Sequence, residues 1–151
     1  MWARLHRFSS LPRPAKLLFL RAAMMLPLLI LSLRLRGFRA TQKSLKKSLS
    51  DANGILQNSD AESCVSVTSR MVLAAARYSP VSSTCLERSL CLWWLLARQG
   101  ITAQFRIGVR KDNEQFAAHA WVERDGVVVG ESQTLHLHYA AFVEEISGDL
   151  T

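Results

Sequence analysis

Three side chains of this sequence have the types that cysteine-dependent acyl transfer needs: Cys85, His119 and Glu131. In such a site the sulfur attacks a carbonyl carbon, the imidazole moves a proton, and the carboxylate orients the imidazole. We therefore predict that Cys85 is the nucleophile, His119 the base and Glu131 the acidic third member. This chemistry needs neither a metal nor an organic cofactor, and we expect neither.

Cys85 stands at the head of a predicted helix in the stretch TCLERSLCLWWLLARQG. Thr84 and Glu87 have capping-box spacing, which makes Thr84 the N-cap and Cys85 the first helical residue, and Gly100 closes the helix. Unpaired backbone N–H groups and the positive end of the helix dipole favour a thiolate at this position, and can also receive an oxyanion. The apolar body CLWWLLA predicts a central core helix that would hold the sulfur in place.

His119 is the best placed of the four histidines, because it lies midway along a predicted strand at 116–123 with an alanine on each side. His6 lies in an irregular lead-in. His136 and His138 form an HxH pair, but no further ligands accompany it. We therefore predict no metal site.

The choice of Glu131 depends on the geometry of one turn. If the RDG turn is a three-residue loop with Gly126 left-handed, His119 faces Glu131 across the hairpin. A two-residue loop would shift the register and direct Glu131 away. Asp125 is the rival carboxylate, but it sits at the hairpin tip, about 20 Å along the strand from His119.

Helical periodicity covers about 15–49, with a break or kink expected near Pro27 and an interruption near Gly37, and a second helix is predicted over 59–77. After Gly100 the pattern becomes alternating, which predicts an antiparallel meander. The tail is expected to begin as a short strand and to end as a helix. The predicted fold class is α+β, with N-terminal helices followed by an antiparallel sheet on a central helix; the strands are 103–109, 116–123 and 127–132. The order of a Cys at a helix start, then a His and an acid on successive strands, resembles the papain and transglutaminase-like arrangement.

The charge is divided between two predicted domains, a basic apolar helical segment at 1–50 and a catalytic domain at 51–151. The first holds eleven Lys/Arg and no Asp/Glu, and the second holds eight Lys/Arg and twelve Asp/Glu. The uncharged run 22–33 is too short to span a bilayer. We favour an apolar helix packed on the protein over peripheral attachment to an anionic membrane, and a cleaved signal is the least favoured interpretation. Poor aromatic interleaving argues against nucleic acid as a partner.

The remaining cysteines, Cys64 and Cys91, lie inside predicted helices and are interpreted as packing residues. Three cysteines make an odd number, and their spacing fits neither a zinc site nor a disulfide framework. A reducing compartment is therefore expected.

The stretch from Cys85 to Ser132 resembles the leader peptidases of lasso-peptide biosynthesis, the B-protein protease domain. The resemblance rests on the spaced combination of C-L-x-R-S-L, I-G-V-R and A-H-A-W-V-E. It implies that Cys85 is the nucleophile, His119 the base, and Glu131 the acid, at a position where many members carry Asp.

The same resemblance implies a cytoplasmic cysteine protease that removes the leader from a ribosomally made precursor peptide. The freed amine of the core is then used for macrolactam closure by a separate ATP-dependent cyclase, which is a further expected partner. In part of the family a recognition domain is fused ahead of the protease. Because residues 1–50 lack its pattern, we expect a separate leader-recognition protein.

Two other functions remain open from the sequence. An amine in place of water could capture the thioester, which would make the protein a transglutaminase-like acyltransferase. Alternatively, the protein could be a non-catalytic, membrane-peripheral adaptor in which the basic segment is the working part.

Overall fold

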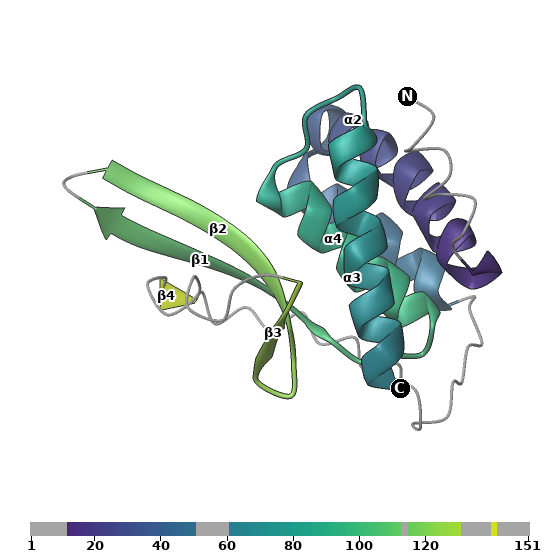
Figure 1. Cartoon of the computed structure of the whole chain (residues 1–151). Coiled ribbons are helices and arrows are strands. Elements are labelled where there is room, and N and C mark those ends of the chain that lie inside the picture. The colour runs from purple at the N-terminus through teal and green to yellow at the C-terminus, as the bar shows by residue number, and fades with distance from the viewer. Residues whose placement is uncertain (1–11, 51–60, 113–114, 131–139, 142–151) are drawn as a thin grey trace.

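The chain forms a helical layer packed on an antiparallel sheet, as Figure 1 shows. The computed structural model describes residues 12–50, 61–112, 115–130 and 140–141. Within these residues the sheet order is β3-β2-β1-β4. The predicted α+β class, with helices before an antiparallel sheet, is confirmed. The elements are α2 (Arg13–Ser50), α3 (Ala61–Tyr78), α4 (Cys85–Arg98), β1 (Gln104–Asp112), β2 (Gln115–Arg124), β3 (Val127–Val129) and β4 (Ala140–Ala141).

The predicted N-terminal helix is present, and the predicted interruption near Gly37 is confirmed, but the helix is not broken at Pro27. Helical structure continues through Pro27, whereas Gly37 has φ 76° and ψ 175°. This conformation suits glycine because it has no Cβ to clash with the backbone. Ser32 and Thr41 lie on the two sides of the interruption, and their hydroxyl groups are hydrogen-bonded at 2.8 Å. The two halves of α2 therefore meet in a fixed corner.

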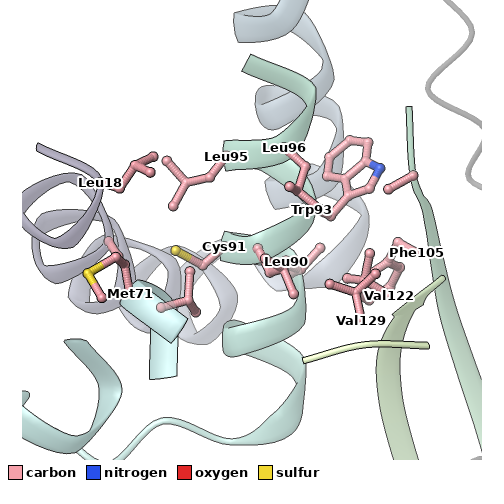
Figure 2. Packing of buried hydrophobic residues seen from close by; sticks show 14 of the residues in the cluster. Leu18, Met71, Leu90, Cys91, Trp93, Leu95, Leu96, Phe105, Val122 and Val129 are labelled. Carbon is pink, nitrogen blue, oxygen red and sulfur yellow. The ribbon is translucent and has the colours of Figure 1, made fainter. Parts of the chain in front are cut away.

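Helix α4 is the centre of the core. Leu90, Cys91, Leu92 and Trp93 are all buried, although four consecutive residues cover every side of a helix. In Figure 2 Cys91 and Leu95 point toward the side of Leu18 and Met71, and Leu90 and Trp93 point toward the strands. The predicted central helix is thus confirmed.

Polar side chains fix α4 to the other two helices. Trp94 Nε1 donates to Ser48 Oγ of α2 at 2.8 Å. Gln99 Nε2 donates to Thr68 Oγ1 of α3 at 3.0 Å. Each bond satisfies a part-buried polar group and also restricts how far α4 can slide along its neighbours.

The two faces of the β1–β2 hairpin have different roles. Phe105 of β1 pairs with Val122 of β2, and both pack into the core beneath α4. Because side chains alternate along a strand, His119 and Trp121 lie on the opposite face. The far end of the hairpin projects away from the helices in Figure 1.

Several predicted features lie outside the described residues: the connector at 51–60, the last two residues of the predicted third strand, and the C-terminal helix. The helix α2 shares one core with α3 and α4. The division of the chain at residue 50 into two domains stays a prediction.

Burial of Cys91 gives the fold a measurable dependence on alkaline pH. Its side chain is fully buried, and this burial raises the pKa of the thiol from its ordinary value of 9.0 to about 12. The unfolded chain therefore loses a proton that the folded chain keeps. Below pH 9 the thiol is protonated in both the folded and the unfolded chain, so it does not change the stability with pH. As the pH rises from 9 toward 12, the free energy of unfolding falls by about 1.4 kcal/mol per pH unit.

Urea unfolding at a series of pH values on both sides of 9 measures this slope. The variant Cys91→Ala should be less stable than the wild type at neutral pH and should lose this part of the alkaline slope. Cys64→Ala is the matched control, since Cys64 is only partly buried, and should retain the slope. Equal slopes for the wild type and Cys91→Ala would contradict the assignment.

Candidate active site

The head of α4 carries the cap that the sequence predicts. Thr84 is the N-cap, and a capping box joins it to Glu87. The backbone N–H of Thr84 donates to Glu87 Oε2 at 2.6 Å, the Thr84 hydroxyl also bonds Glu87 Oε2, and the N–H of Leu86 donates to Thr84 Oγ1 at 3.3 Å. Cys85 is therefore the first residue of a well-defined helix start. Its side chain is partly buried against the core.

Ser89 joins this helix head to the strand that carries His119. Its Oγ donates to the backbone carbonyl of Ala120 at 2.9 Å, and the bond is buried. Cys85 lies one helical turn before Ser89, about 6 Å along the helix axis. His119 is the immediate neighbour of Ala120. A single hydrogen bond therefore brings the backbones of the two predicted catalytic residues into one region.

His119 is part of an ordered row of side chains on one face of β2. Its ring stacks on Trp121, with centroids 6.0 Å apart and planes at 15°. Trp121 is 2% exposed, and its Nε1 donates to Glu123 Oε1 at 2.7 Å. Glu123 also pairs with Arg106 of β1, at 3.2 Å between Nε and Oε2. The indole of Trp121 thus lies between the imidazole and Glu123. Because Glu123 holds the indole in place, the indole limits where the imidazole can lie.

A small cavity of about 20 Å³ lies between the head of α4 and this row. Arg88, Ser89 and Trp121 contribute to its wall, together with Ser69 of α3 and Gly130. The rest of the lining is apolar, from Val72, Leu73, Leu92 and Val129, and the volume is about that of one water molecule. Arg88 and Ser89, near the start of α4, therefore share this cavity with Trp121 of β2.

The turn on which the choice of Glu131 depended is different from the one predicted. The loop has two residues, Asp125 and Gly126, both with positive φ (52° and 76°), as a type I′ turn requires. Val129 consequently faces Val122 rather than Trp121. The three-residue loop was wrong, although Gly126 is left-handed and Asp125 is at the tip, as expected.

The strand ladder of β3 also ends before the last described residue of this segment. β3 ends at Val129, and Gly130 has φ +80°. A Cβ at Gly130 would meet the Cβ of Ser69 at 3.1 Å, so this close approach also favours glycine. Glu131 itself lies outside the described residues. Its role as the acidic third member stays a prediction without the support of strand register.

Other candidate residues are resolved only in part. Cys64 packs against the core, as predicted, and Cys91 is buried within it. His6, His136 and His138 lie outside the described residues. Among the described residues, no group of three or more His, Cys, Asp or Glu side chains could hold a metal ion.

Sequence reasoning missed two positioning residues, Ser89 and Glu123. A serine one turn after Cys85 in an otherwise apolar helix is a signal that could have identified the first. The i, i+2 spacing of His119, Trp121 and Glu123 placed all three on one face, but the bond between the indole and the carboxylate needed the folded structure.

The arrangement of a cysteine at a capped helix head beside a histidine-bearing antiparallel strand defines a class of thiol-dependent acyl-transfer folds. A sequence profile of the transglutaminase-like superfamily matches residues 22–144. The chain belongs to this superfamily, whose fold is typical of cysteine peptidases and acyltransferases. Comparisons with curated proteins and with solved structures gave no match.

The bond between Ser89 and Ala120 makes a prediction about stability. Ser89→Ala leaves the buried carbonyl of Ala120 without its donor, so the free energy of unfolding should fall by about 1–3 kcal/mol in urea titrations. Ser89→Thr keeps the hydroxyl and should lose less.

The matched control for this prediction is Ser44→Ala. Ser44 Oγ donates to the carbonyl of Ala40 at 3.0 Å, but in an exposed part of α2. Water can replace that bond, so the control should change stability by less than about 0.5 kcal/mol. Equal losses in the free energy of unfolding at the two serines would show that the buried Ser89 bond contributes no more to stability than an exposed one.

Proposed function

We propose that this protein is a cysteine peptidase that removes the leader from a ribosomally made lasso-peptide precursor. The observation that carries the proposal is the buried bond from Ser89 to Ala120, which joins the helix head of Cys85 to the strand of His119. Membership of the transglutaminase-like superfamily supports the acyl-transfer chemistry. The motifs around Cys85 and His119, which resemble those of lasso leader peptidases, support the choice of substrate.

In the proposed mechanism the sulfur of Cys85 attacks the carbonyl carbon at the junction of leader and core. The backbone N–H of Cys85, at the start of α4, holds the oxyanion that forms. His119 protonates the departing amine of the core, and the leader remains bound to Cys85 as a thioester. With His119 as base, water then attacks the thioester, releasing the leader carboxylate and restoring the thiol.

Trp121 and Glu123 have positioning roles in this proposal. The indole stacks on the imidazole, and Glu123 holds the indole from the far side. Glu131 is proposed as the carboxylate that orients the imidazole. The precursor is proposed to arrive on a separate leader-recognition protein, and the product amine to pass to an ATP-dependent cyclase.

The decisive assay mixes the full chain with the precursor and its recognition protein and follows leader removal by mass spectrometry. Cys85→Ala should abolish cleavage, because it removes the only sulfur at the head of α4. Cys64→Ala is the matched control and should retain cleavage, since Cys64 packs against the core in α3. Undiminished cleavage by Cys85→Ala would end the proposal.

The same mass spectra separate hydrolysis from acyl transfer. Hydrolysis gives a leader with a free carboxylate, whereas an amine acceptor gives a leader that is heavier by the amine less one water. Addition of a primary amine should leave the leader mass unchanged if water is the acceptor. Quantitative conversion to the amide would favour the acyltransferase.

Selective labelling of cysteines tests the enzyme against the non-catalytic adaptor. With a thiol-alkylating reagent near neutral pH, Cys85 should react fastest, because the nucleophile of the proposed mechanism must be open to an incoming molecule at the head of α4. Cys91 should be protected until the chain unfolds, since it is fully buried. Peptide mapping after timed labelling gives the three rates. Uniform, slow labelling of all three cysteines would support the adaptor instead.

A further inference from the structure

Helix α2 has a second apolar stripe that the fold leaves uncovered. Its six side chains are spaced three or four residues apart, so they lie along one face of the helix. They are between 49% and 74% exposed, and the stripe consists of Leu17, Leu20, Met24, Leu28, Leu31 and Leu35. Single exposed leucines are ordinary, but a continuous apolar strip of this length on one element indicates a binding surface.

The opposite face of the same helix is already used. Ala15, Leu18, Ala22, Leu26 and Leu29 have the same spacing and are buried in the core against α3 and α4. The exposed stripe is therefore a second set of apolar side chains, and packing within the described part of the chain does not explain it.

The charge of α2 indicates which kind of partner this stripe would bind. The helix α2 contains nine Lys/Arg and no Asp/Glu. Arg13 lies at the end of the stripe, and Arg21 and Arg34 flank it; all three are exposed. Leucines that enter the acyl boundary, with arginines at the level of the phosphates, form the pattern of a helix that lies in a membrane interface.

We propose that the exposed stripe of α2 docks on the surface of an anionic lipid bilayer, so that the protein is a peripheral membrane protein. A second copy of the chain is a poorer occupant, because it would bring an equally basic face against this one. The lipid headgroup phosphates supply the negative charge that the helix lacks.

The helix is also long and apolar enough to span a membrane by length and composition, with a mean hydropathy of 1.9 over its best 18 residues. Core helices and signal sequences share this property. Spanning would withdraw Leu18 and Leu26 from the core, and the sharp turn at Gly37 divides the helix. Lying on the surface keeps the buried face in place and uses only the exposed stripe.

Flotation of the full chain with phospholipid vesicles tests the proposal. Vesicles that contain phosphatidylglycerol should carry the protein, phosphatidylcholine vesicles should carry much less, and high salt should weaken the binding. Leu31→Glu should lower partitioning about tenfold or more, because it replaces an inserted leucine with a charge. A milder variant, Leu31→Ser, should weaken binding without placing a charge on the surface.

The matched control is Val127→Glu. Val127 is 53% exposed, close to the 54% of Leu31, but it lies on β3. This variant should float like the wild type, and thermal unfolding of all variants checks that they remain folded. Failure of the wild type to float with anionic vesicles would overturn the proposal. So would resistance of membrane-bound protein to alkaline carbonate, which indicates a spanning helix, or a dimer that Leu31→Glu dissociates in the absence of lipid.

Discussion

Burial of α4 on all sides is the constraint on which the rest of the structure depends. A helix with apolar side chains at Leu90, Cys91, Leu92 and Trp93 has no solvent face through this stretch, so other elements must surround it. The helices α2 and α3 cover one side and the sheet covers the other. The first turn is the part of α4 that leaves this enclosure, and it carries Cys85. The core thus fixes the position of the helix head that carries Cys85.

Local signals in the sequence predicted local structure well. The capping box of Thr84 and Glu87 was correct because all its bonds lie within one turn. The β2–β3 turn was wrong because Asp-Gly is the favoured pair for a two-residue type I′ turn, and this preference overrode the assumed longer loop. The interruption near Gly37 was predicted correctly, whereas the break expected near Pro27 was wrong. Proline at 27 is accommodated within the helix, whereas Gly37 supplies the positive φ that a sharp corner needs.

Only those features of the candidate site that depend on residue types, the helix cap and strand periodicity could be predicted from the sequence. They placed Cys85 at a helix start and His119 on a strand. They could not show that Ser89 joins the two elements, because a bond between residues 31 positions apart depends on how the helix and the sheet pack. Strand periodicity placed Trp121 and Glu123 on one face, but their hydrogen bond depends on side-chain orientation, which only the folded chain shows.

The uneven distribution of charge along the chain bears on the roles of the two apolar faces of α2. Residues 1–50 carry only positive charge, and residues 51–151 carry four more acidic than basic side chains. Near an anionic surface the first part is attracted and the second is repelled, so the same field that draws α2 toward lipid orients the rest of the molecule away from it. One face of α2 completes the core that holds α4, and the other is left to meet a surface. A helix that only packs on a core needs one apolar stripe. In the proposal, the second stripe supplies the apolar contact with lipid, and the positive charge of α2 supplies the attraction to it.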